Sequence, residues 1–218
     1  MLLYNKETEF HSRIIVNKIT ESAAFYLSNL QLTEFDKTEL SKYVVEKRKL
    51  QWYASRYTIR LLLNQDEIIH LNKDEFGRPF ILNHDIHISL SHTNSMVVAI
   101  SNNMYKVGVD LEQIRDKVKR IAHKFTTEKE CKYITIENEN ATLITIWSAK
   151  ESIYKMYSQK QLDFKEHILL EPFEYKGSGS FKAWLSKENL HNCCLFKVAF
   201  LLKIENEEFS IYAKPICL

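Results

Sequence analysis

The sequence predicts an α+β protein built from two similar lobes, each an antiparallel sheet packed with helices. Each half carries one long stretch of apolar residues at helical spacing, over residues 46–63 and 141–157. Each half also contains segments in which apolar and polar residues alternate, as they do in strands with one buried face. We therefore expect an N-terminal lobe over residues 1–104 and a C-terminal lobe over residues 105–218.

Composition narrows the class of protein. The chain has 218 residues, of which 45% are hydrophobic, enough for a packed core. Its 30 basic and 28 acidic residues leave a net charge of only +2, without the basic excess typical of nucleic-acid binding. Lys6, Glu7 and Glu9 interrupt the N-terminus too early for a signal peptide, and no apolar run reaches the ~20 residues of a membrane span. We expect a cytoplasmic protein that does not enter a membrane.

The first half is expected to contain the following elements in order: a strand near residues 13–16, a short helix over 21–30, a helix capped by Asp36, the helix over 46–63, and strands over 86–91, 96–100 and 107–112. Asp36 is followed three residues later by Glu39, the spacing of a helix start. The turn Gly77-Arg78-Pro79 precedes the strands. We expect the three strands to form an antiparallel meander.

The second half is expected to begin with a basic stretch over residues 115–124. A capping box at Thr127 and Glu130 predicts a helix that extends to about Glu137. After the helix over 141–157, strand patterns occupy residues 168–173, 181–185, 195–204 and 209–213.

The strand over residues 107–112 ends in two acids, Asp110 and Glu112. Because successive side chains of a strand point to opposite faces, these two carboxylates share one face and repel each other. Hard oxygen ligands of this kind suit Mg²⁺, which binds through a few carboxylates together with substrate phosphates. The alternative is a polar strand end that faces solvent.

Two helices carry charged residues that also allow two interpretations. Arg56 and Arg60 lie four residues apart on one helix, with Lys47 near its start, so they form either a phosphate site or an ordinary solvated face. Glu151 and Lys155 have the same spacing on the helix over 141–157. Taken alone they are an ordinary surface ion pair.

Four pieces of sequence occur in a suggestive order: Gly77-Arg78-Pro79, Ser91-His92, Gly108-Val109-Asp110-Leu111-Glu112, and Trp147-Ser148-Ala149-Lys150-Glu151-Ser152-Ile153-Tyr154-Lys155. Together they resemble the phosphopantetheinyl transferases, specifically the larger two-lobed, monomeric class of the surfactin type. The motifs G-[VI]-D-x-E and W-[ST]-x-K-E-[AS]-x-x-K carry the resemblance most specifically. It spans about Lys47 to Lys155. Family members often have lysine where this chain has Arg78, which keeps the charge but changes its reach.

The resemblance implies two lobes with pseudo-twofold symmetry and an active site at their interface. It also implies Mg²⁺-dependent transfer of 4′-phosphopantetheine from coenzyme A to a serine of an apo carrier protein, with release of 3′,5′-ADP. Asp110, Glu112 and Glu151 would hold the metal, and Glu151 is also the family's candidate base. Lys155 would act on the phosphates. The other coenzyme A ligands would be Arg56, Lys73, Arg78, Ser91 and His92.

The carrier protein, acyl or peptidyl, would dock near Arg115, Ile121 and Phe125, where basic residues alternate with apolar ones. A solvated charged loop is the alternative for this stretch. The resemblance also implies a monomer. Two other functions use the same residues: a Mg²⁺-dependent nucleotide or coenzyme A phosphohydrolase, and a coenzyme A-binding module without catalysis.

Overall fold

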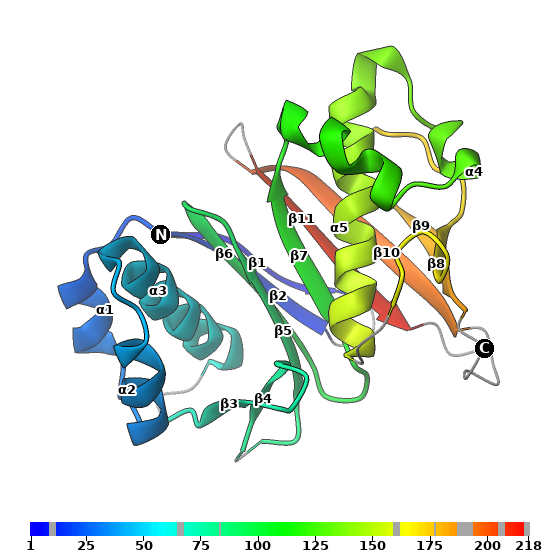
Figure 1. Cartoon of the computed structure of the whole chain (residues 1–218). Coiled ribbons are helices and arrows are strands. Elements are labelled where there is room, and N and C mark those ends of the chain that lie inside the picture. The colour runs from blue at the N-terminus through cyan, green and yellow to red at the C-terminus, as the bar shows by residue number, and fades with distance from the viewer. Residues whose placement is uncertain are drawn as a thin grey trace. The chain divides into compact units, whose positions relative to one another are not determined.

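The computed structural model describes residues 1–8, 12–64, 68–82, 84–158, 162–176, 178–186, 194–204 and 208–215, with the side chains of residues up to 186 except that of Thr8 (Figure 1). The chain divides into two compact units, Met1–Tyr105 and Lys106–Leu218. Both contain helices packed on antiparallel sheet, so the predicted α+β class is confirmed. Among the described helices, none has the length and apolar character needed to cross a bilayer.

Unit 1 contains a four-stranded antiparallel sheet in the order β1-β2-β6-β5. Its strands are β1 (Leu2–Thr8), β2 (Ser12–Lys18), β5 (His87–His92) and β6 (Met96–Asn102). The helices α1 (Ala23–Asn29), α2 (Glu34–Ser41) and α3 (Glu46–Leu63) lie together on one side of this sheet (Figure 1). A small hairpin of β3 (Leu71–Lys73) and β4 (Pro79–Ile81) completes the unit.

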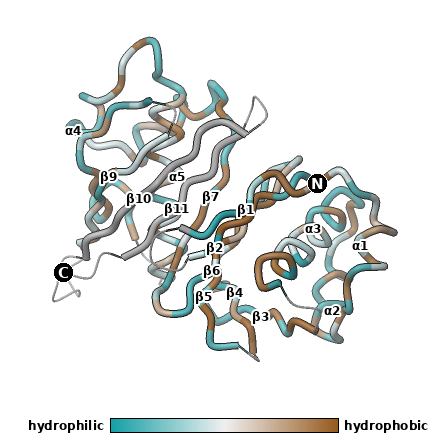
Figure 2. The backbone as a smooth tube through the Cα atoms, turned by 180° about the vertical axis from the view of Figure 1, so that it is seen from behind, coloured by the Kyte–Doolittle hydropathy of each residue, from teal (hydrophilic) through white to brown (hydrophobic). Residues whose placement is uncertain are grey.

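Helix α3 has the bounds that its periodicity predicts. Its apolar face includes Trp52, Ile59 and Leu62, which are all buried. The helix packs on β2 and β6, whose hydrophobic runs are brown in Figure 2. Burial of this stripe supplies most of the stability of such a helix. The preceding helix, α2, begins one turn earlier than Asp36 predicts, because Thr33 is the N-cap and Asp36 is the third helical residue of a reciprocal capping box.

Unit 2 contains a five-stranded antiparallel sheet in the order β7-β11-β10-β9-β8. The strands are β7 (Gly108–Gln113), β8 (Ile168–Leu170), β9 (Ser178–Leu185), β10 (Cys194–Ile204) and β11 (Glu208–Pro215). The long helix α5 (Glu139–Tyr157) lies across the sheet and contacts β7 and β11 most extensively (Figure 1). Ile146, Ala149 and Ile153 of this helix are fully buried in the core of the unit.

Short helical segments connect β7 to α5. They are the 3₁₀ segment η2 (Asp116–Lys124), the single-turn helix α4 (Glu128–Cys131) and the 3₁₀ turn η3 (Ile136–Asn138). The predicted helix over residues 128–137 therefore ends after one turn. Its capping box forms as predicted, but Ile136 is 95% exposed, so a second and third turn would not be held by burial of an apolar face.

The predicted meander over residues 86–112 is wrong in its third strand. β5 pairs with β6, but β7 pairs with β11, with Asp110 opposite Ile211. The local pattern identifies each strand correctly and does not identify its partner, which lies about 100 residues further along the chain.

Candidate active site

The candidate site lies between β7 and α5. The first sequence motif lies on β7 and the second lies on α5, and their side chains repeat at similar distances along the two elements. In a strand every second residue faces the same way and advances about 6.6 Å, while four helical residues advance about 6 Å on one face. Alternate residues of β7 are therefore spaced like every fourth residue of α5. The strand and the helix run in opposite directions, because Glu112 contacts Trp147 while Asp110, which is earlier on the strand, contacts Lys155, which is later on the helix.

Gly108 permits the close approach of these two elements. A Cβ atom at this position would lie 1.8 Å from the backbone oxygen of Ser152 and 3.1 Å from the backbone nitrogen of Met156. The backbone of α5 thus occupies the space of the missing side chain. Any larger residue would push α5 away from the strand that carries the two acids.

Asp110 forms an ion pair with Lys155 of α5. The Lys155 Nζ atom donates to Asp110 Oδ1 at 2.6 Å and to the backbone oxygen of Val109 at 3.1 Å. The side chain of Asp110 is 6% exposed and that of Lys155 is 29% exposed. Lys155 therefore reaches across to β7, which a simple i, i+4 pair with Glu151 on the helix surface would not require.

Glu112 is held by Trp147, which lies about two turns before Lys155 near the middle of α5. The indole Nε1 of Trp147 donates to Glu112 Oε1 at 3.2 Å. Burial raises the pKa of Glu112, and the nearby negative charge of Asp110 raises that pKa further, while the Trp147 hydrogen bond lowers it. The alternative of a strand end facing solvent is wrong for Asp110, which is buried, and only partly true of Glu112, which is half-buried.

Glu151 lies between Trp147 and Lys155 on the same face of α5. Burial, and after it the charges of Asp110 and Glu112, raise the pKa of its carboxyl from 4.5 to about 7, while the charge of Lys155 opposes them. The three carboxylates therefore act on one another electrostatically. A carboxyl with a pKa near neutrality can accept or release a proton at physiological pH.

The donor set suits a hard divalent cation. Two carboxylates on one strand face and a third within electrostatic range are oxygen ligands whose mutual repulsion a cation would relieve. Within the described part of the chain, no group of three or more His, Cys, Asp or Glu side chains is close enough to form a ready-made metal site. Mg²⁺ does not require one, because it usually binds one or two carboxylates together with phosphate oxygens and water.

The predicted coenzyme A ligands of unit 1 lie on three different elements. Lys73 and Arg78 belong to the β3–β4 hairpin, where Lys73 pairs with Glu39 at 3.4 Å and burial lowers the pKa of Arg78. Ser91 and His92 end β5, and His92 is exposed. Asp74 shapes the hairpin turn by accepting hydrogen bonds from the backbone nitrogens of Phe76 and Arg78 at 2.9 and 2.8 Å.

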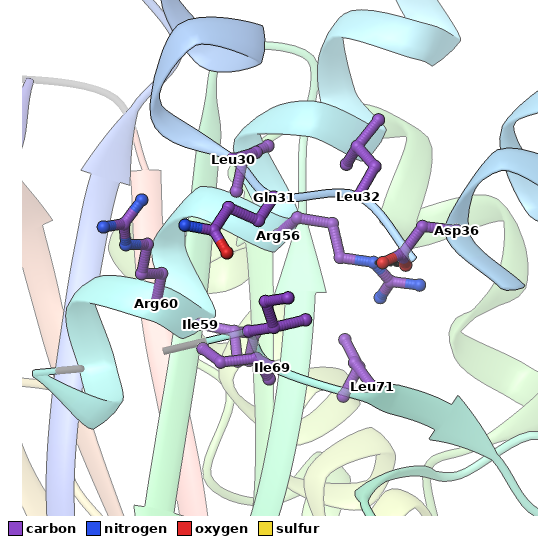
Figure 3. A pocket seen from close by; sticks show the side chains of 10 residues that line it. Leu30, Gln31, Leu32, Asp36, Arg56, Ile59, Arg60, Ile69 and Leu71 are labelled. Atoms are coloured by element: carbon purple, nitrogen blue, oxygen red, sulfur yellow. Dashed lines mark hydrogen bonds and ion pairs between the residues drawn. The ribbon is translucent and has the colours of Figure 1, made fainter. Parts of the chain in front are cut away.

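Arg56 of α3 is already bound within unit 1. Its Nε donates to Asp36 Oδ1 at 2.9 Å, and its guanidinium lies 4.6 Å from the centre of the Trp52 ring. Figure 3 shows Arg56 and Asp36 in a pocket whose lining also includes Leu30, Leu32, Ile59, Arg60, Ile69 and Leu71. The cavity there is about 30 Å³, which is room for a few water molecules at most.

The predicted carrier-docking residues differ in exposure. Arg115 is exposed and Ile121 is partly buried, but Phe125 is 0% exposed, so the expectation that Phe125 is an exposed docking residue is wrong. Its ring packs edge-on against Trp147 at 5.1 Å between centroids. The sequence could not reveal this, because the partner ring comes from α5, more than 20 residues away.

Two residues of the site were not predicted to have a role of their own. Trp147 orients Glu112, and Gly108 sets the distance between strand and helix. Both belong to the two motifs, which was the available signal. Their roles depend on the packing of β7 against α5, which neither motif reveals alone.

Comparison with known proteins agrees with this geometry. Residues 106–207 match the family model described as the 4'-phosphopantetheinyl transferase superfamily. A curated protein, the 4'-phosphopantetheinyl transferase gsp of Aneurinibacillus migulanus, is 36% identical over 104 residues. This match covers 46% of the present chain and 43% of that relative. The resemblance predicted from the motifs is confirmed, and the family match lies within unit 2.

Proposed function

We propose that this protein transfers 4′-phosphopantetheine from coenzyme A to a serine of an apo carrier protein, with Mg²⁺ and with release of 3′,5′-ADP. The observation that carries the proposal is the joint placement of Asp110, Glu112, Glu151 and Lys155 between β7 and α5. The similarity to the transferase superfamily and to a transferase of that name supports the same reaction. A protein that only bound coenzyme A would not need this combination of acids and lysine.

Asp110 and Glu112 would hold the metal, with Glu151 as a third oxygen ligand or as the neighbouring base. The bound cation would supply charge neutralisation at the pyrophosphate of coenzyme A. Lys155, whose Nζ atom donates to Asp110, would donate to the same phosphate oxygens. Trp147 keeps one oxygen of Glu112 in a fixed direction.

We assign to Glu151 the role of the base that accepts the serine proton. In the reaction the serine oxygen bonds to the phosphorus that carries pantetheine, and the bond from this phosphorus to the 3′,5′-ADP oxygen breaks. The serine proton passes to Glu151, directly or through water. A carboxyl whose pKa is raised to about 7 is a better base near neutral pH than an ordinary glutamate.

Unit 1 would bind coenzyme A through the β3–β4 hairpin and the end of β5. Arg78 and the exposed rings of Phe76 and Phe80 offer a cation and flat apolar surfaces for the adenine part. Ser91 and His92 would contact phosphates. Because Arg56 already binds Asp36, we propose three candidate ligands for the 3′-phosphate: Arg56 itself and the exposed residues Lys47 and Arg48 of α3.

Carrier docking is proposed for segment η2 and the residue before it. Arg115, Lys117, Arg120 and Lys124 are exposed there, and Ile121 is partly exposed among them. A basic surface of this kind suits an acidic carrier protein. We propose that the protein acts as a monomer and that the reaction uses residues of both units.

The test is Mg²⁺-dependent labelling of an apo carrier by the Glu112→Gln variant. Glutamine keeps an oxygen that can accept from Trp147 but removes the charge, so the fold should persist while labelling falls by about 100-fold or more. Asp110→Asn should behave in the same way. The exposed carboxylate Glu174, changed to glutamine, is the matched control and should leave labelling unchanged.

Undiminished labelling by folded Glu112→Gln and Asp110→Asn would contradict the metal assignment. Incubation of the wild type with coenzyme A and Mg²⁺, with no carrier present, distinguishes a transferase from a hydrolase by the release of 3′,5′-ADP. A transferase needs the acceptor serine, whereas a hydrolase would release 3′,5′-ADP without it.

A further inference from the structure

Lys150 precedes Glu151 in the motif, and no step of the proposed reaction uses it. Its side chain is 0% exposed, although lysine is rarely buried without a partner. Its Nζ atom donates three hydrogen bonds, to Glu130 Oε2 at 2.9 Å, to the backbone oxygen of Phe125 at 2.7 Å and to that of Phe164 at 2.9 Å. All three donors of the ammonium group are therefore used inside the protein.

Glu130, the partner of this lysine, is 1% exposed and is equally well bound. Its Oε2 atom also accepts from the backbone nitrogen of Thr127 at 2.8 Å, and its Oε1 accepts from the backbone nitrogen of Leu170 at 3.1 Å. The Glu130–Lys150 pair thus joins α5 to four separate stretches of unit 2, namely the end of η2, the start of α4, the loop at Phe164 and strand β8.

The two carbonyl groups held by Lys150 belong to residues whose rings contact Trp147. The Phe125 ring lies 5.1 Å and the Phe164 ring 5.4 Å from the Trp147 ring, measured between centroids. Trp147 lies three residues before Lys150, on the same side of α5. Its indole in turn donates to Glu112. The contacts therefore run without a gap from Lys150, through two aromatic rings and Trp147, to Glu112.

We propose that Glu130 and Lys150 are positioning residues: together they fix Phe125 and Phe164 around Trp147, so that the indole holds the Glu112 carboxylate in place for the divalent cation. The part concerning the cation rests on the proposed function, whereas the part concerning Trp147 does not. A buried ion pair of this kind often adds little to stability over apolar residues of the same shape, which favours a role in geometry.

The test compares full-length proteins in which the pair is replaced. In Glu130→Gln with Lys150→Met both charges are removed, so neither is left buried alone, and the hydrogen bonds to the two Phe carbonyls are lost. The matched control is Glu174→Gln with Lys176→Met, which removes an exposed pair of the same unit at 2.8 Å. Each protein is also made with Trp147→Phe, so that the difference in near-ultraviolet circular dichroism isolates the signal of this indole.

The Trp147 difference signal should fall at least about twofold in the Glu130/Lys150 variant, since such signals weaken as aromatic packing loosens. It should be unchanged in the control. The concentration of Mg²⁺ that gives half-maximal transfer should rise about tenfold, the usual effect of disturbing a group that orients a metal ligand. An unchanged Trp147 signal in the folded variant would overturn the proposal.

The single substitution Glu130→Gln provides a second variant, because it keeps the shape of the side chain and leaves Lys150 able to donate to both carbonyl groups. It leaves the lysine charge buried without its partner, so this variant should be the less stable of the two. A smaller fall in the Trp147 signal is expected. If both variants lose their cooperative thermal transition, the pair is required for folding as a whole and the positioning role is rejected. If the wild type transfers nothing, the proposed function fails, yet the circular dichroism comparison still decides the role of the pair.

Discussion

Glu151 on α5 is influenced by three nearby charges. The ammonium group of Lys155 favours its ionised form, and the carboxylates of Asp110 and Glu112 oppose it. Lys155 lowers the pKa of Glu151, but burial, Asp110 and Glu112 together raise that pKa to about 7. The folded protein therefore keeps a proton on Glu151 at pH values where an unfolded chain would have released it.

This difference predicts how stability depends on pH when divalent cations are removed with EDTA. Below pH 4.5 the carboxyl is protonated in both states, and between about pH 4.5 and 7 only the folded state keeps the proton. Raising the pH through this window should therefore destabilise the protein, by up to about 3 kcal/mol for a shift of this size before solvent screening reduces it. Thermal unfolding midpoints at several pH values measure the effect.

Glu151→Gln should flatten this dependence and raise the midpoint most near pH 7.5, because glutamine carries no charge to bury. Some slope should remain, since the pKa of Glu112 is also raised. A variant that keeps the full slope of the wild type would show that Glu151 does not titrate as described.

At the residue scale, the sequence predicts the arrangement of the two acids of β7 but not the burial of the aromatic ring of Phe125. Alternation along a strand was sufficient to predict that Asp110 and Glu112 share a face, because that periodicity is local. It could not show that Phe125 is buried while Ile121, four residues earlier on η2, is partly exposed. That distinction arises from the ring of Trp147 on another element.

At the scale of elements, the backbones of the strand β7 and the helix α5 are in direct contact at Gly108, because glycine has no side chain to separate them. The backbone oxygen of Ser152 lies only 1.8 Å from the position that a Cβ of residue 108 would take. The alignment of the two acids of β7 with Glu151 and Lys155 of α5 depends on this contact.

Gly108→Ala should accordingly destabilise the protein by about 3 kcal/mol, the upper part of the usual range for overpacking. Gly77 is the matched control, because it has φ of +85° and no atom lies within 4 Å of the place that a Cβ would take. Gly77→Ala should cost only about 1–2 kcal/mol of backbone strain. Thermal unfolding compares the two.

Gly108→Ala should also lose transfer activity more than its stability loss explains, since the acids move away from α5. Equal losses of stability in the two alanine variants, with activity retained, would contradict the close contact.

The long helices α3 and α5 were predictable, because each repeats its apolar residues over four or more turns. Strand pairing was not. The pattern over residues 107–112 predicts a strand, but its partner β11 belongs to the last part of the chain. Likewise the capping box at Thr127 marks where α4 begins, but it carries no information about where α4 ends.

At the scale of the whole molecule, the proposed residues are distributed over both units. Arg78, Ser91 and His92, which we propose bind coenzyme A, belong to unit 1, and the residues proposed for the metal and for proton transfer belong to unit 2. The family match lies within unit 2, so the assignment of unit 1 rests on the motifs in its hairpin and at the end of β5. The proposed reaction therefore needs both units.

The most direct test of the central claim is the intact mass of a small panel of apo acyl and peptidyl carrier proteins after incubation with the wild-type protein, coenzyme A and Mg²⁺. We predict that at least one carrier gains the mass of a single phosphopantetheine, that 3′,5′-ADP is released in equal amount, and that the gain disappears when its acceptor serine is changed to alanine. Release of 3′,5′-ADP with no gain of mass on any carrier would contradict the account.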